Sequence, residues 1–217
     1  MTDPARSATG ALVAERENGA RDVSAPGMRR IAGALGAGLP VIVTSESVDG
    51  GFGALVCFAA EAFDTAAATF LIAHTSGFVT VTVPGEVMAR LNLPMMYPRF
   101  DTDSGRFCVA IDAAEGVTTG ISAADRAHTI GLVAAPATRA EQLVRPGHVV
   151  PVAVGGAFCA ARWSVYDTLW SLSIQAGLSG VVAAAALVNG TEEVDHGFIS
   201  RFSADIGLPA LSSAQAV

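Results

Sequence analysis

The feature of the sequence that most constrains the fold is a regular alternation of short apolar runs with helix-type segments. Runs of five to nine mostly apolar residues, bounded by Gly, Pro or polar residues, are typical of buried strands. They lie at 40–44, 53–60, 77–83, 106–112, 148–154 and 180–188. Segments with a helical pattern lie between them, at 28–38, 64–74, 122–134 and 165–177. The alternation predicts a mixed α/β (α+β) fold.

Length and composition place these elements in a single domain. The chain has 217 residues, of which 51% are hydrophobic and 15% charged, enough to bury a substantial core in one compact unit. Residues 1–27 are rich in Ala, Gly, Arg, Glu and Ser and have little apolar periodicity, so we expect a mobile tail there. We expect residues 28–217 to form the domain, without internal repeats.

Charge and hydropathy exclude several classes of partner. The net charge of −7 offers no basic surface for nucleic acid. The longest apolar run, 180–188, is too short to span a membrane, and the N-terminus lacks the pattern of a secretory signal, so we expect a cytoplasmic protein. Cys57, Cys108 and Cys159 show no metal-type spacing and are expected to be reduced core thiols. We expect no cofactor.

A polar stretch, TTGISAADR at 118–126, separates an apolar run from a helical segment. Ser122 followed three residues later by Asp125 resembles a capping box, in which Ser122 would accept a hydrogen bond from the first helical turn. Thr118, Thr119 and Gly120 before a helix start are also typical of an anion site. The pattern favours the cap and leaves the anion site open.

Three long motifs carry a resemblance to a known family. They are HTSGFVTV at 74–81, FCVAIDAAEGVTTGISAADRAHTI at 107–130 and RPGHVVPV at 145–152. In this order they resemble 3,4-dihydroxy-2-butanone 4-phosphate synthase, a lyase of the riboflavin pathway that converts ribulose 5-phosphate into a four-carbon ketone phosphate and formate. The resemblance covers about residues 28–208. It implies that family's single-domain fold and a homodimer with active sites near the subunit interface.

The sequence departs from the family where the family's chemistry is concentrated. The acidic loop after the first strand reads SESVDGGFGA at 45–54, so that the substrate-contacting Arg falls on Asp49, the metal-binding Glu on Gly50, and further acids on Phe52 and Ala54. The family's second metal ligand, a His, falls on Val165, and a catalytic Glu falls on Ala184. Divalent cations need oxygen or imidazole ligands, so we expect no metal site here.

The resemblance also supplies candidate site residues. His148 matches a catalytic His of the family; we interpret it as a proton carrier, the alternative being a structural role at a strand start. Arg162 matches a phosphate-contacting Arg, although a surface Arg without ligand is nearly as well supported. The remaining residues expected to bind substrate are Thr118, Thr119, Phe52, Trp163, Val165, Tyr166 and Asp167.

Three functions follow from these observations. The first, which we favour from the sequence, is a repurposed, metal-independent enzyme of specialised metabolism, a cyclase or proton-transfer enzyme whose pocket takes a more apolar small molecule. The second is a non-catalytic paralogue that acts as a binding or partner protein. The third is a genuine 3,4-dihydroxy-2-butanone 4-phosphate synthase with replacement ligands that the motif does not reveal.

Overall fold

The computed structural model describes residues 26–46, 52–97, 106–156, 163–192 and 194–212. The expected tail, residues 1–27, lies outside them except for Pro26 and Gly27, which begin the first described helix. The strands are β1 (Val41–Glu46), β2 (Phe52–Ala59), β3 (Thr80–Pro84), β4 (Ile111–Ala113), β5 (Leu143–Val154), β6 (Val182–Ala186) and β7 (Ala210–Ser212). The described α-helices are α2 (Pro26–Gly36), α3 (Thr65–His74), α4 (Gly85–Leu91), α5 (Ala123–Ala134), α7 (Val165–Gln175) and α8 (His196–Ile206).

The strands form one seven-stranded sheet in the order β4-β5-β3-β6-β2-β1-β7. Strands β1 and β2 are antiparallel neighbours along the chain, with Val41 opposite Cys57. The other pairs join distant segments: β3 and β5 run parallel, with Thr80 beside Val150, and β4 runs antiparallel to β5. The mixed sheet confirms the predicted α/β class.

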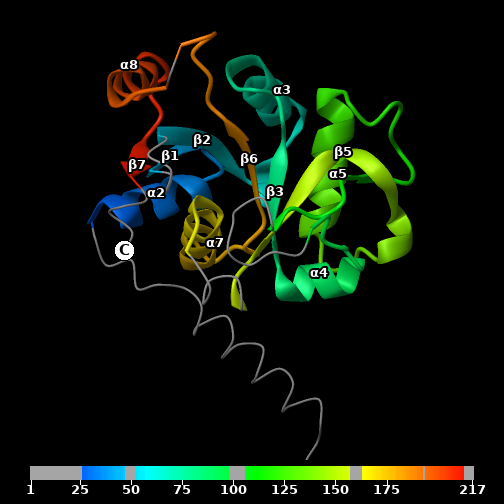
Figure 1. The fold of residues 1–217 in the computed structure, drawn as a ribbon. Helices are drawn as coiled ribbons and strands as arrows, with labels where there is room; N and C mark the ends of the chain where they lie inside the picture. The colour runs from blue at the N-terminus through cyan, green and yellow to red at the C-terminus, as the bar shows by residue number, and fades with distance from the viewer. Residues whose placement is uncertain (1–25, 47–51, 98–105, 157–162, 193, 213–217) are drawn as a thin grey trace, which may run out of the picture.

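The alternation of side chains along each strand divides the core between the two faces of the sheet. In β1, Ile42 packs into a cluster with α3, α4, α5 and α8, whereas Val41 and Val43 pack into a second cluster with α2 and α7. Figure 1 shows α2 and α7 on one face of the sheet. Both faces of the central strands are therefore covered by helices, as their continuous apolar runs require.

Two of the three cysteines lie in this core. Cys57 on β2 and Cys108, just before β4, are free thiols and fully buried. Burial raises the pKa of the Cys57 thiol far above its usual range and that of Cys108 to about 11. Both fit the expectation of reduced core thiols, and Cys159 lies outside the described residues.

In the described part of the chain, every helix is too short or too polar to cross a lipid bilayer.

Candidate functional site

His148 and Asp112 form a hydrogen-bonded pair where β5 passes β4. The backbone N–H of His148 donates to Oδ1 of Asp112 at 2.9 Å, and Nδ1 of its ring lies 2.7 Å from Oδ2 of the same carboxylate. The Asp112 side chain is only 9% exposed, whereas that of His148 is 38% exposed. A buried carboxylate thus holds an imidazole that is open to solvent, which is the arrangement of a general acid or base with its orienting group.

An irregularity in strand pairing creates this pair. Ile111 lies opposite Val149, but the next residue, Asp112, lies opposite Val144, so the intervening residues of β5 form a bulge. Gly147 lies in the bulge, where a Cβ atom would come within 2.0 Å of the backbone of Ile111. Only glycine permits this approach, and the bulge brings His148 beside Asp112.

The loop after β4 closes over the pair at Gly120. This glycine has a φ of +83°, and a Cβ atom there would lie 2.0 Å from Oδ2 of Asp112 and 2.8 Å from Nδ1 of His148. The loop backbone therefore packs directly against the hydrogen bond between the two side chains. Water has no room to replace that bond from the side of the loop.

The residues 118–126 form a helix cap that also folds this loop. The Ser122 hydroxyl accepts a hydrogen bond from the backbone N–H of Asp125 at 3.1 Å, which confirms the predicted cap. The Asp125 carboxylate accepts from the backbone N–H and hydroxyl of Thr118 and from the N–H of Gly120. These bonds, led by the Thr118 hydroxyl, lower the pKa of Asp125. The backbone N–H groups of Thr118 and Gly120 are therefore hydrogen-bonded within the loop.

Arg126 connects the cap to the neighbouring strand. It is 8% exposed, and its guanidinium donates to the carbonyl oxygens of Ile121 at 2.8 Å and Gly77 at 2.7 Å. Burial lowers its pKa, and the favourable charge interaction with Asp112 opposes that effect. A fixed positive charge therefore accompanies the Asp112 carboxylate on the side of α5.

A second polar cluster lies at the start of α7. The guanidinium of Arg106 forms a fully buried ion pair with the Asp167 carboxylate. That carboxylate also accepts from the backbone N–H groups of Ser164 at 2.9 Å and Gly155 at 3.2 Å, while Ser164 caps the helix. Asp167 is 0% exposed, so its oxygens hold protein groups in the described structure.

Three further residues predicted to bind substrate, Trp163, Val165 and Tyr166, lie next to this cluster and contact mainly apolar neighbours. Trp163 is half-buried and donates from its indole N–H to the Thr168 hydroxyl at 2.9 Å. Tyr166 is 9% exposed and packs edge-on against Phe107, and Val165 contacts the same core. Arg162 lies outside the described residues, as does the side chain of Phe52 on the first residue of β2.

The two groups of predicted residues do not converge within one chain. His148 lies near the middle of β5, whereas Gly155, which binds Asp167, follows its last residue. His148 and Gly155 are seven positions apart along extended chain, roughly 23 Å at 3.3 Å per residue. Thr118 and Thr119 lie in the loop that covers the His148 pair, and both are exposed. The structure thus groups the threonines with His148 and leaves Trp163, Val165, Tyr166 and Asp167 at the far end of the strand.

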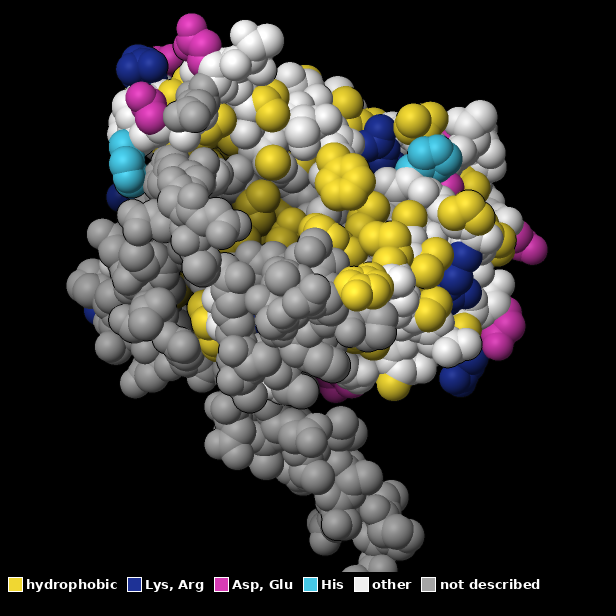
Figure 2. Space-filling view, viewed as in Figure 1, with side chains coloured by type: hydrophobic (Ala, Val, Ile, Leu, Met, Phe, Trp, Pro, Cys, Tyr) yellow, Lys and Arg dark blue, Asp and Glu magenta, His cyan; other side chains and the backbone are white. Residues whose placement is uncertain are grey.

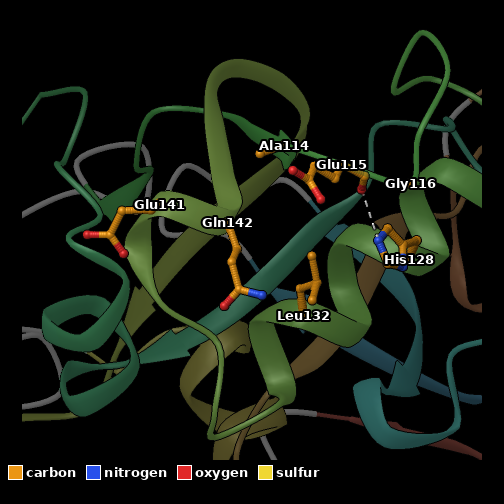
Figure 3. Close-up of a pocket in the computed structure, with 7 residues that line it drawn as sticks. All are labelled: Ala114, Glu115, Gly116, His128, Leu132, Glu141 and Gln142. Atoms are coloured by element: carbon orange, nitrogen blue, oxygen red, sulfur yellow. Dashed lines mark hydrogen bonds between the residues drawn. The ribbon is translucent and has the colours of Figure 1, made fainter.

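A pocket of about 410 Å³ lies beside the loop, on the surface of α5. It is lined by Ala114, Glu115, Gly116, His128, Leu132, Glu141 and Gln142, drawn in Figure 3. The imidazole Nε2 of His128 lies 3.1 Å from the backbone oxygen of Glu115, the contact marked by the dashed line. None of the predicted site residues lines this pocket. The candidate site is therefore assigned to His148 and Asp112, because their side chains form an acid–base pair.

The positions where the family binds a divalent cation carry few donor atoms in this chain. In the described ranges, no group of three or more His, Cys, Asp or Glu side chains is arranged to hold a metal ion. Val165 and Ala184 carry no donor atom on their side chains, and Gly50 lies outside the described residues. The described residues do not fit a magnesium site, and the expectation that the whole chain lacks one stays a prediction.

Comparison with known proteins shows similarity to riboflavin biosynthesis proteins and to a 3,4-dihydroxy-2-butanone 4-phosphate synthase. The chain is 36% identical over 168 residues to riboflavin biosynthesis protein RibBA of Nocardia farcinica, which covers 77% of this chain and 40% of the relative. It is 41% identical over 117 residues to 3,4-dihydroxy-2-butanone 4-phosphate synthase of Neisseria meningitidis serogroup B, covering 54% and 32%. The chain therefore spans well under half the length of these curated relatives.

Solved structures agree with this similarity. The crystal structure of 3,4-dihydroxy-2-butanone 4-phosphate synthase of Candida albicans matches with a TM-score of 0.76 and 27% identity, over 87% of this chain and 94% of the other. A synthase in complex with two magnesium ions matches with the same TM-score and 26% identity, over 87% and 93%. The shared fold extends over nearly the whole of both solved chains.

These relatives contradict the favoured interpretation of the sequence. We expected a repurposed, metal-independent enzyme, because Gly50, Val165 and Ala184 replace side chains that the family uses. The relatives at 36–41% identity are riboflavin biosynthesis proteins and synthases, and they support the third reading, a genuine synthase. The interpretation as a cyclase of specialised metabolism was wrong because it gave three aligned positions more weight than similarity that extends over most of the domain.

The model of the family 3,4-dihydroxy-2-butanone 4-phosphate synthase matches residues 29–217, which includes every described strand and almost all of the described chain. The three motifs, His148, Asp112 and the loop that contains Gly120 all lie within this match. The chain belongs to the 3,4-dihydroxy-2-butanone 4-phosphate synthase family.

Proposed function

We propose that the chain is a lyase that converts ribulose 5-phosphate into 3,4-dihydroxy-2-butanone 4-phosphate and formate. The observation that carries the proposal is the pair formed by His148 and Asp112, which joins two of the three family motifs. All the carbon, hydrogen, oxygen and phosphorus atoms of ribulose 5-phosphate are accounted for by the four-carbon ketone phosphate and formic acid together, so the net reaction consumes no water and no oxidant. It does need proton transfers at carbons next to a carbonyl group.

His148 is proposed to carry these protons. Its imidazole is the exposed partner of a buried carboxylate, and an imidazole can both accept and donate a proton. The ring nitrogen that does not face Asp112 is Nε2, and we propose that this atom accepts the proton from the substrate. Asp112 stabilises the imidazolium that forms, as a carboxylate does in other acid–base pairs.

Exposed hydroxyl groups beside His148 are proposed to orient the substrate. Thr119 lies on the surface of the loop that packs against the pair, next to Gly120. The Thr118 hydroxyl already binds Asp125 at 2.8 Å, so it fixes the loop, and Thr119 is the better candidate for contact with substrate oxygens. Arg162, at the position of a phosphate-contacting Arg, remains a proposed ligand of the substrate phosphate.

A homodimer is proposed because the predicted site residues lie in two separate groups within one chain. His148 and the cluster at the start of α7 lie at different ends of β5, and a second copy arranged by two-fold symmetry would supply the missing end. Exposed apolar side chains support an interface; they include Phe78, 58% exposed, two residues before β3, and Ile121, 53% exposed, beside Gly120. Figure 2 shows apolar side chains gathered in a hollow near the centre of one face. A stable mass of one chain by light scattering at micromolar concentration would contradict the dimer.

Formate release tests the proposed activity. Purified protein is incubated with ribulose 5-phosphate, with Mg²⁺ and with a chelator in parallel, and formate is measured by a coupled dehydrogenase. The proposal predicts formate in at least one of the two conditions, and a loss of about 10²- to 10⁴-fold in turnover in His148→Gln, the range for removal of a general acid or base. Absence of formate from the folded wild-type protein in both conditions would contradict the proposal.

A further inference from the structure

We infer that Asp112 is a positioning residue that holds His148 in the Nδ1–H tautomer and leaves Nε2 unprotonated toward solvent. The inference concerns a residue that the sequence motifs did not single out. Its part in catalysis rests on the proposed function, whereas the tautomer of the imidazole is a property of the folded protein and can be measured without substrate.

The hydrogen bonds around Asp112 determine the tautomer. Oδ1 accepts the backbone N–H of His148 at 2.9 Å, a donor whose position is fixed by the strand. Oδ2 lies 2.7 Å from Nδ1 of the ring, and an ionised carboxylate offers only acceptors. Nδ1 must therefore carry a hydrogen, and in a neutral imidazole Nε2 then has a free lone pair.

The surroundings of the pair prevent the ring from exchanging this partner. The backbone at Gly120 covers Oδ2 of Asp112 and Nδ1 of His148 so closely that a single added methyl group would overlap both. On the side of α5, the buried Arg126 interacts favourably with the charge of Asp112 and is held by two carbonyl oxygens. Asp125 in the same helix turn is occupied by Thr118 and Gly120.

For the variant Asp112→Asn, the inference predicts a change in the tautomer of His148 that a merely structural role of Asp112 would not produce. Its side chain has one acceptor and one donor group in nearly the shape of the carboxylate. The backbone N–H of His148 requires the acceptor at the position of Oδ1, so the amide NH₂ must face Nδ1. Nδ1 then has to accept, which moves the hydrogen to Nε2. The substitution is therefore expected to invert the tautomer without removing a hydrogen bond.

Nitrogen NMR of the histidine rings measures this directly. The protein is labelled with ¹⁵N-histidine, and the resonances of His148 are assigned among those of the four histidines by comparison with His148→Gln. The inference predicts Nδ1–H with unprotonated Nε2 in the wild type at a pH where the ring is neutral, and the opposite in Asp112→Asn. Asp64→Asn serves as the matched control, because Asp64 caps α3 through Ala67 and Asn caps equally well.

A rate measurement with the same variants connects the tautomer to the reaction. Asp112→Asn is expected to lower kcat by about 10²- to 10⁴-fold with little change in KM, because Nε2–H cannot accept a proton. Asp64→Asn is expected to keep both constants. A wild-type ring in the Nε2–H form, or an unchanged tautomer in Asp112→Asn, would overturn the inference, and the wild-type spectrum decides even if the variant does not fold. Full kcat in Asp112→Asn would overturn the catalytic part. The predicted tautomers in a protein that releases no formate would refute only the proposed function.

Discussion

Replacement of Gly120 by alanine tests whether the loop packs against the Asp112–His148 pair as closely as described. The new methyl group meets two separate penalties. The first is the left-handed backbone, φ +83°, which disfavours an alanine by about 1–2 kcal/mol. The second is overlap with Oδ2 of Asp112 at 2.0 Å and Nδ1 of His148 at 2.8 Å, which forces a shift of buried groups worth roughly 1–3 kcal/mol. Together they predict a loss of about 2–5 kcal/mol in the free energy of unfolding.

A second glycine separates the two effects. Gly177 has a similar φ of +76°, but a Cβ atom there would have no neighbour within 4 Å. Gly177→Ala is therefore expected to lose only the backbone part, about 1–2 kcal/mol, or roughly 2–8 °C in Tm for a chain of this size. Urea denaturation of both variants gives the difference, which the structure sets at about 1–3 kcal/mol. Equal losses in the two variants, or a smaller loss in Gly120→Ala, would refute the close packing of the loop.

Two further predictions concern buried carboxylates. Asp125→Asn should be less stable than the wild type at pH 6, because the lowered pKa of Asp125 means that folding favours its ionised form. The wild type should lose this advantage as the pH falls below 3.8, the ordinary pKa of aspartate, and then through the lower pKa of Asp125 in the folded protein. Denaturation midpoints between pH 2 and 6 measure it, and a difference independent of pH would contradict the assigned hydrogen bonds. Asp167→Ala should lose about 3–5 kcal/mol of stability, because it leaves the fully buried charge of Arg106 without its carboxylate partner. A loss below about 1 kcal/mol would show that the pair is not buried as described.

Much of the fold could be predicted from local patterns. Ser122 and Asp125 predicted the start of α5, and the apolar runs predicted most of the sheet. Elements with mixed signals were missed. Helix α4 was missed because it begins with Gly85 directly after Pro84, a pair typical of a turn. Strand β5 begins five residues before His148, and this early part was missed because Pro146 and Gly147 are typical of the end of a strand. Helix α8 could have been found from its Asp195 cap and the left-handed Gly207 at its end.

The candidate site depended on contacts between distant residues. The motif identified His148, but its partner Asp112 precedes it by 36 positions and meets it only through the bulge between β4 and β5. Arg106 and Asp167 are 61 positions apart and join across the end of β5. No local periodicity contains such pairings. The sequence motifs and the substitution at Val165 favoured a repurposed enzyme, and the similarity to riboflavin biosynthesis proteins and solved synthases supports a synthase instead.

The fate of uniformly ¹³C-labelled ribulose 5-phosphate tests the central claim most directly. Carbon NMR follows all five carbons during incubation with the wild-type protein, with His148→Gln in parallel. The account predicts labelled formate and a four-carbon ketone phosphate in equal amounts from the wild type, and both products reduced by about 10²-fold or more in the folded variant. Unchanged substrate, or a rearranged five-carbon sugar without formate, would contradict the proposed lyase, and equal product formation by His148→Gln would contradict the role of His148.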